Sequence, residues 1–265
     1  MAITTLDQYI AAASQRVQIL KTGSVTAVAL MNTQVLQAAG NPGAGTLAGA
    51  NTANGLVPTD ADAGFPAINA FGGGATGYIG NITFGNTVTS RITLFDCLFK
   101  AGAYAFNANT TLASQPSYSG RVIGGTDFTN TEIWIEAVTA FTGNQSIAVT
   151  YTNQSGTAAR TTGTIATGVA PIVGRMLQLP LQAGDTGVQK IESVVSTVST
   201  VGTFNVLVLR RLWSGRVPVA NSGDVHDFLK TGMPQIFADS ALMAIVQPDR
   251  TATGIFELVA EVING

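Results

Sequence analysis

Charged residues are scarce in this sequence. Its 265 residues include 15 Asp and Glu, 13 Lys and Arg and a single histidine, His226, whereas 46% are hydrophobic. Between Thr22 and Ser90 the only charged residues are Asp60 and Asp62. Soluble monomeric domains usually carry about a quarter charged residues, because surface charge keeps molecules apart. The low charge therefore favours a subunit whose surface is covered by other protein over a freely diffusing catalyst.

Cysteine is almost absent, since Cys97 is the only one. One cysteine cannot form a disulfide within the chain, and Cys97 lies in the apolar run of residues 94–99, where we expect a buried, inert thiol. The net charge of −2 gives no long-range attraction for phosphate. This argues against a specific nucleic acid as a main partner.

Long apolar runs are missing as well. The positive mean hydropathy of +0.31 comes from Ala and Val scattered among polar residues, with no stretch of about 18 apolar residues. We therefore expect no membrane-spanning helix and no membrane partner. The first residues lack a basic region followed by an apolar stretch, so we expect no signal peptide.

The first 40 residues have a helical pattern. Thr5 and Gln8 match a capping box, Lys21 would lie in the last turn, and Gly23 would end the helix. The apolar residues at helical spacing are Leu6, Tyr9, Ile10, Ala13, Val17 and Leu20. A second, weaker pattern begins after Ser24. We predict an N-terminal helical segment over residues 1–40, either a pair of helices or a helix followed by a strand.

Residues 41–77 change character. This segment is rich in Gly, Ala and Asn and has neither helical nor strand periodicity, yet it carries several large apolar residues. Disordered segments usually lack such apolar anchors. We therefore predict an extended arm that becomes ordered against neighbouring subunits. Its candidate interface residues are Leu47, Leu56, Phe65 and Phe71.

Residues 78–265 read as β structure. The alternation in residues 132–138 places Ile133 and Ile135 on one face of a strand and Trp134 on the other. Residues 145–167 read as a hairpin because turn residues separate two strand-like runs. Further strands are expected at 79–84, 88–99, 175–181, 188–198, 203–212 and 254–263, with a helical turn at 227–230. The predicted fold is mainly β, an antiparallel β-sandwich or jelly roll with the N-terminal helical segment and the long arm.

Five of these runs together resemble the virion structural proteins of tailed bacteriophages. They are residues 132–136, 147–156, 177–181, 187–194 and 202–209, and the resemblance covers roughly residues 130–213, about a third of the chain. The resemblance implies a β-sandwich or jelly-roll subunit attached to the virion, and several members of the group are attached to the head. It implies no catalytic residue.

Three glycines match the spacing of a dinucleotide-binding loop. Gly72, Gly74 and Gly77 have this spacing, and Asp96 follows near the expected acidic position. No strand precedes the glycines, however, and a β-like sequence follows where the helix should begin. We therefore interpret the segment as a flexible loop.

Two acidic clusters are weak candidates for chemistry. Asp60 and Asp62 could donate oxygens to Ca²⁺, but the further acidic ligands of an EF-hand are missing, so a solvated turn is favoured. The imidazole of the sequence clusters with carboxylates in one segment, which contains Asp224, His226 and Asp227. No nucleophile motif accompanies this segment. A loop or helix cap is favoured there, with Asp224 as the capping residue.

Glu132 and Glu136 could be a glycosidase pair. Four strand residues separate them by roughly 13 Å, which is beyond the ~5–10 Å that glycoside hydrolysis uses. They flank Trp134, which we interpret as a packing or interface residue rather than a carbohydrate platform, as is Trp213. Trp134 joins the candidate interface residues.

These observations predict a non-enzymatic virion subunit, most specifically a capsid-associated decoration or minor capsid protein that stabilises the phage head. A tail-associated or fibre-associated protein that binds a receptor or glycan is the alternative. The expected partners are further copies of the chain in a symmetric homo-oligomer, with a trimer the expected form, and the major capsid protein or other virion proteins. We expect no cofactor, no metal and no catalytic residue, and a location in the virion after synthesis in the host cytoplasm.

Overall fold

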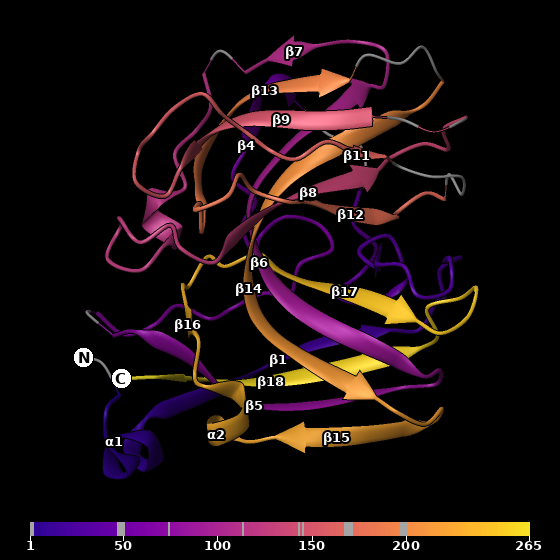
Figure 1. Cartoon of the computed structure of the whole chain (residues 1–265). Coiled ribbons are helices and arrows are strands. Elements are labelled where there is room, and N and C mark those ends of the chain that lie inside the picture. Colours follow the sequence, from indigo (N-terminus) through magenta and orange to yellow (C-terminus); the bar gives the residue numbers. More distant parts are fainter. Residues whose placement is uncertain are drawn as a thin grey trace.

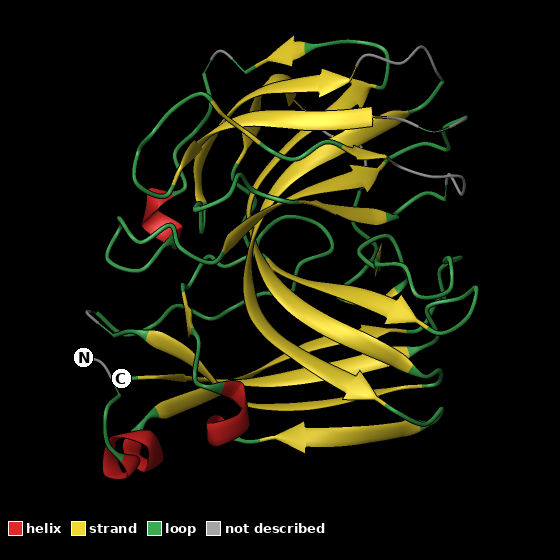
Figure 2. Cartoon of the chain, viewed as in Figure 1, coloured by secondary structure: helices red, strands yellow, loops and turns green. Residues whose placement is uncertain are grey.

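The computed structural model describes residues 3–46, 51–73, 75–112, 114–142, 144, 146–166, 172–196 and 201–265. About 50% of the chain is in strands and 5% in helices, and every strand pairing is antiparallel. The helical elements are short, as Figure 2 shows. They are α1 (Leu6–Ala11), the 3-10 turn η1 (Ser119–Arg121) and α2 (Phe228–Thr231). None of the described helices is long and apolar enough to cross a membrane.

The described strands form three sheets. The lower sheet has the order β15 (Ser222–His226), β5 (Gly77–Asn86), β18 (Phe256–Asn264), β1 (Ala13–Lys21) and β3 (Gly40–Asn41), with β16 (Gln235–Ile236) also paired to β5. The upper sheet has the order β10 (Arg160–Thr161), β9 (Ser146–Asn153), β13 (Val188–Ser196) and β7 (Thr110–Thr111), with β11 (Ile165–Ala166) paired to β9. The shared sheet has the order β12 (Met176–Leu179), β8 (Thr131–Ala137), β14 (Thr203–Val217), β6 (Ser90–Ala105), β17 (Leu242–Pro248) and β2 (Thr33–Gln34), with β4 (Asn51–Leu56) paired to β6.

Two long strands join two lobes. Figure 1 shows β6 and β14 running from the upper lobe, where the upper sheet lies, into the lower lobe, where the lower sheet lies. β6 has 16 residues and β14 has 15, and their pairing shifts register three times. Such bulges bend and twist a sheet locally. One face of the shared sheet therefore covers the cores of both lobes.

Each lobe has its own apolar core. In the upper lobe, Val149 and Ile191 of the upper sheet pack against Val206 of the shared sheet. In the lower lobe, Ile19 and Leu258 of the lower sheet pack against residues of the shared sheet. A third cluster covers the opposite face of the shared sheet. Its buried members are Leu36, Phe65, Phe95, Cys97, Trp134, Met176, Leu207, Leu209, Ala241, Met243 and Ile245.

The β prediction is confirmed. Strands occur at every run expected between residues 79 and 263, and β9 pairs back with β10 and β11 as the predicted hairpin. Cys97 is fully buried, and burial raises the pKa of its thiol to about 12, as expected for an inert cysteine. The helical turn near residue 228 is also present as α2.

The prediction of an N-terminal helical segment is largely wrong. The capping box of Thr5 and Gln8 is present, but its helix α1 ends at Ala11. Residues 13–21 form β1, which pairs with β18 along its whole length, and residues 24–39 form no helix. Val17 and Ile19 alternate into the core, so this stretch fits a strand as well as a helix, and pairing with a strand some 240 residues away decides between them. Residues 3–40 thus belong to the β fold instead of forming a separate helical unit.

Lys21 lies at the end of β1 instead of in a helical turn. Its ammonium is buried and donates hydrogen bonds to the carbonyl oxygens of Ala38, Pro42 and Gly43, at 3.2, 2.9 and 3.4 Å. Burial lowers the pKa of Lys21. This side chain therefore ties the segment around β3 to the lower sheet.

The extended arm packs against its own chain. Phe65 is 8% exposed and joins the third cluster, and Ile68 is buried in the lower core. Phe71 is half-buried against that same core. The expectation that neighbouring subunits order this arm is therefore corrected for these residues, because the third cluster and the lower core of the same chain already accept them.

Candidate functional site

The five candidate interface residues do not form one surface. Phe65 and Trp134 are buried inside the chain, with Trp134 only 3% exposed, so neither is a surface anchor. Leu56 and Phe71 are half-buried, and Leu47 lies outside the described residues. The alternation predicted for β8 is correct, but both of its faces are covered, because the third cluster packs over Trp134.

His226 has structural partners. Its Nδ1 accepts a hydrogen bond of 2.9 Å from Nε1 of Trp213, and its Nε2 lies 3.5 Å from Oδ2 of Asp224. Asp227, rather than Asp224, caps α2 by accepting a hydrogen bond from the backbone of Lys230 at 3.0 Å. A hydrogen bond from the backbone of Val225 lowers the pKa of Asp224. No nucleophilic side chain is bonded to the imidazole among the described contacts.

Neither the glycine motif nor the pair Asp60 and Asp62 forms a ligand site in the described residues. Gly77 begins strand β5, so no helix follows the glycines, and Gly74 lies outside the described residues. Asp62 accepts a hydrogen bond from the backbone of Thr59, and Asp60 accepts one from the backbone of Ile68, both at 2.8 Å. In the described part of the chain, no three His, Cys, Asp or Glu side chains gather where they could hold a metal ion.

Glu132 and Glu136 each have a cationic partner. Glu132 lies 2.9 Å from Arg211 and accepts a hydrogen bond from Trp134 at 2.8 Å. Glu136 is fully buried, 3.4 Å from Lys100. Glu132 therefore ties β8 to the neighbouring β14, Glu136 ties β8 to β6 across β14, and the full burial of Glu136 keeps a sugar from reaching the pair.

A buried ionic cluster lies between the two cores. Asp96 on β6 accepts hydrogen bonds from Arg121, from Arg210 at 3.2 Å and from Ser240 at 2.8 Å. Arg121 also donates to the carbonyl oxygen of Pro58 at 2.8 Å. Burial is the main cause that lowers the pKa of Arg210, although Asp96 opposes it. The cluster fixes η1, β14 and the turn before β17 to one point of the shared sheet.

A second ionic cluster lies at the edge of the upper sheet. Asp185 accepts hydrogen bonds from Arg160 at 2.9 Å, from Tyr151 at 2.6 Å and from Asn153 at 2.8 Å. The bond from Arg160 is the main cause that lowers the pKa of Asp185 to about 2. Burial and this carboxylate raise the pKa of Tyr151 to about 12, so its hydroxyl stays protonated and acts as a donor.

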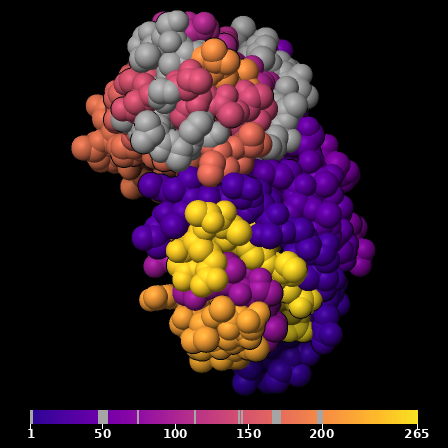
Figure 3. All heavy atoms as spheres, turned by 90° about the vertical axis from the view of Figure 1, so that its right-hand side faces the viewer, coloured from indigo at the N-terminus to yellow at the C-terminus, as the bar shows by residue number. Residues whose placement is uncertain are grey.

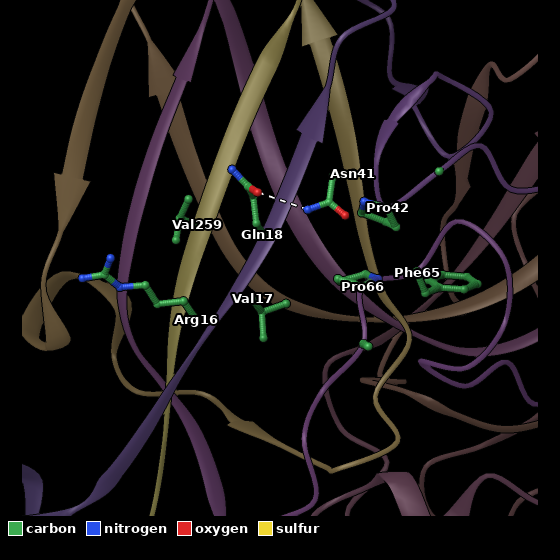
Figure 4. Close-up of a pocket in the computed structure, with 10 residues that line it drawn as sticks. Arg16, Val17, Gln18, Asn41, Pro42, Phe65, Pro66 and Val259 are labelled. Atoms are coloured by element: carbon green, nitrogen blue, oxygen red, sulfur yellow. Dashed lines mark hydrogen bonds between the residues drawn. The ribbon is translucent and has the colours of Figure 1, made fainter.

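A groove opens along the outer side of β1. It has a volume of about 740 Å³, and Figure 4 shows Arg16 and Gln18 of β1 on one side with Pro66 on the other. β3 pairs only with Leu20 and Lys21, so the remainder of β1 has no strand on that side among the described residues. The lining residues are Arg16, Val17, Gln18, Asn41, Pro42, Gly43, Phe65, Pro66, Ala67 and Val259.

A chain of hydrogen bonds crosses the groove. Asn41 donates to the side-chain oxygen of Gln18 at 3.1 Å, and Gln18 donates to Glu257 at 2.6 Å. A second hollow of about 390 Å³ adjoins the groove, since Arg16 and Val259 line both. Its other lining residues are Asn81, Thr83, Glu257 and Glu261. Amide, guanidinium and carboxylate groups of this kind can bind a polar surface or ligand by hydrogen bonds and charge.

Sequence reasoning did not find this groove. Its residues come from β1, the segment around β3, the loop before β5 and β18, which are far apart in the sequence. The alternation of Arg16 and Gln18 with buried Val17 is the only local signal, and the same residues also fit the spacing of a helix. The Asp96 cluster was also missed, although a carboxylate inside the apolar run of residues 94–99 was a visible signal.

Comparison with known proteins establishes no relationship. No family model matches the chain, and no curated protein matches it. Among solved structures, the chain matches a chain in the structure of infectious bursal disease virus Gx strain. The match covers 96% of this chain and 80% of the viral chain, at 12% identity and a TM-score of 0.18. The match to the VP2 subviral particle of infectious bursal disease virus covers 96% of this chain and 79% of the VP2 chain, at 11% identity and a TM-score of 0.17. Superpositions this poor do not establish a shared fold.

Proposed function

We propose that this chain is a non-enzymatic structural subunit of a viral particle and, more specifically, a capsid-associated decoration or minor capsid protein of a tailed bacteriophage. It is made in the host cytoplasm and stabilises the head through contacts with the major capsid protein and with further copies of itself. The observation that carries the proposal is how little charge the folded chain leaves on its surface.

Seven of the few charged residues lie inside the fold. They are Lys21, Lys100, Arg121, Arg175, Arg210, Asp96 and Glu136. The sequence already has few charged residues, and this burial leaves even fewer of them on the surface. A surface of this kind favours association, because little like-charge repulsion keeps copies or partners apart.

Large apolar side chains remain exposed on both lobes. Ile10 is 72% exposed, Leu229 is 76% exposed and Val201 is 73% exposed. Covering such residues in subunit contacts contributes about 25 cal/mol per Å² before ordering costs are subtracted. The resemblance of the strand pattern in residues 132–209 to tailed-phage virion proteins supports the same assignment.

The proposal is tested by adding the purified chain to phage heads that lack it. We expect the chain to sediment with the heads, to saturate at a fixed copy number, and to raise the temperature at which heads release DNA. Imaging of the decorated particle then shows which faces contact the major capsid protein. Heads that bind the chain without any gain in thermal resistance would contradict the stabilising role, and absence of binding would contradict the location.

A tail-associated or fibre-associated protein that binds a receptor or glycan is the second candidate. The groove beside β1 favours it, because Gln18, Asn41 and Glu257 present amide and carboxylate groups that hydrogen-bond hydroxyls. This second function requires that the chain bind isolated tails and host-surface polysaccharide. Replacing Asn41 by Ala should then weaken polysaccharide binding, whereas Asn221→Ala at an exposed turn of the same lobe should not.

A further inference from the structure

Two arginines face each other across neighbouring strands of the lower lobe. Arg91 of β6 lies directly opposite Arg216 of β14. Both are exposed, and within the described residues neither forms an ion pair. Like charges directly opposite each other in a sheet are destabilising. An arrangement of this kind gains stability when a partner supplies negative charge.

The arginine pair lies on the side of the shared sheet that faces away from the lower core. Their neighbours Ile92 and Val217 are buried in that core, so alternation directs Arg91 and Arg216 outward. Both border a hollow of about 160 Å³. Asp249 also lines it, but its carboxylate lies 3.2 Å from Arg250. Figure 3 shows this end of the lower lobe, where the turns that follow β5 (magenta), β14 (orange) and β17 (yellow) lie side by side.

The opposite side of the same lobe is acidic. Leu258, Ala260 and Val262 of β18 are buried in the lower core, whereas Glu257 and Glu261 line the outer hollow of about 390 Å³. Arg16 is the one cation among the residues that line this hollow. The charges of Glu261 and Asp227 add to burial in raising the pKa of nearby Tyr9, which agrees with an excess of carboxylate on this side.

We propose that the Arg91 and Arg216 pair of one copy docks into the Glu257 and Glu261 hollow of a second copy. Guanidinium groups bind carboxylates through paired hydrogen bonds, so two arginines on one face are complementary in charge to two glutamates on the other. The inference rests on the proposed function, because it names the contact through which copies of the subunit associate.

A second copy is the occupant because one contact neutralises both faces. The two surfaces lie on opposite sides of one lobe, so the contact is head-to-tail and not a two-fold contact between identical patches. Repetition of a head-to-tail contact gives a closed ring, such as the expected trimer, if the rotation closes. An anion such as phosphate would neutralise only the arginines and leave the glutamates unmatched.

Charge reversal on each face provides the test. We expect the wild-type chain to self-associate in low salt by sedimentation velocity. The double variants Arg91→Glu/Arg216→Glu and Glu257→Arg/Glu261→Arg should each weaken self-association at least about tenfold. Mixing the two variants should restore association between unlike copies, because the reversed face of each variant then meets a complementary face of the other. Raising the salt concentration should weaken the wild-type and the mixed complexes alike.

Matched variants separate this contact from general charge effects. Lys190 is exposed on the upper sheet, and Lys190→Glu changes the net charge as much as Arg216→Glu does. Only Arg216→Glu should weaken association. The neutral pair Arg91→Gln/Arg216→Gln tests the contact if charge reversal perturbs the fold, which circular dichroism monitors.

Three results would overturn the inference. They are a wild-type chain that stays monomeric up to roughly 100 μM, folded double variants that associate as well as wild type, and a mixture of variants that does not regain association. Binding of the chain to heads is measured separately. If the variants still assemble with each other and with heads, the assembly role stands and this contact is wrong.

Discussion

Asp96 holds two arginines at the point where the lobes meet. Its neighbours along β6 belong to different cores, with Leu94 in the lower core and Leu98 in the upper core. Arg121 and Arg210 reach it from η1 and β14. A buried carboxylate with two buried guanidiniums is stable only as a complete set, because each charge loses its hydration on burial.

Replacing Asp96 by Ala should lower the free energy of unfolding by about 3–5 kcal/mol, because both guanidiniums stay buried without their carboxylate. Chemical denaturation measures the change. Asp249→Ala is the matched control, since its ion pair with Arg250 is exposed and should contribute only about 0–1 kcal/mol. Equal effects of the two substitutions would show that the Asp96 cluster contributes no more than an exposed pair.

Protonation of Asp185 should contribute to the loss of folding stability at low pH. Its pKa is about 2 in the folded chain and 3.8 for an unperturbed carboxyl, mainly because of the bond from Arg160. A depressed folded pKa means that the stability it provides is complete above pH 4 and is lost as the pH falls towards 2. The difference in melting temperature between wild type and Asp185→Asn should therefore shrink over this range. Asp239→Asn, at an exposed carboxylate, is the control for removing one negative charge.

At the scale of elements, β1 shows how a short stretch acquires its structure. Its nine residues pair with β18, while β3 covers only its last two residues. Lys21 closes this end by donating to three carbonyl oxygens of residues 38–43. The groove beside β1 exists because the segment around β3 turns away and the loop at Pro66 returns on the other side (Figure 4).

Lys21→Ala should loosen the segment around β3. The substitution leaves three carbonyl oxygens without their donor, and we expect a loss of about 1–3 kcal/mol. Hydrogen exchange should quicken at residues 38–43 and remain unchanged in the upper sheet. Lys190→Ala, which removes an exposed lysine, should change neither quantity. Unchanged exchange near β3 in Lys21→Ala would contradict the tethering role.

At the scale of the whole molecule, the shared sheet makes two cores interdependent. β6 and β14 contribute residues to both cores, so one lobe cannot lose its sheet without exposing the other. The third cluster adds a layer over the same strands, with Leu36 and Phe65 covering the outer face. We therefore expect the two lobes to unfold together as one cooperative unit.

The two tryptophans allow a direct test of cooperativity. Trp213 lies in the lower core, and Trp134 lies in the third cluster. The variants Trp134→Phe and Trp213→Phe each leave one fluorescent reporter. The far-ultraviolet circular dichroism and the tryptophan fluorescence should give one denaturation midpoint within each variant. Two separate midpoints in either variant would show that the lobes unfold independently.

The class of fold and many of its strands follow from local patterns in the amino-acid sequence. Alternation in residues 132–137, the hairpin after Asn153 and the buried environment of Cys97 are local signals, because side chains two residues apart share a face of a strand. The capping box at Thr5 was also readable, since it involves neighbours only. The scarcity of charge came directly from composition.

Other features depend on pairing between distant strands, which local patterns do not predict. Residues 13–21 satisfied both helical and strand spacing until β18 became their partner. The sequence leaves Trp134 as either a packing or an interface residue, and Phe65 with the rest of the third cluster covers its face. The groove residues, the Asp96 cluster and the Arg91 and Arg216 pair depend on register between distant strands, and local periodicity carries no information about which strand lies alongside or in which register.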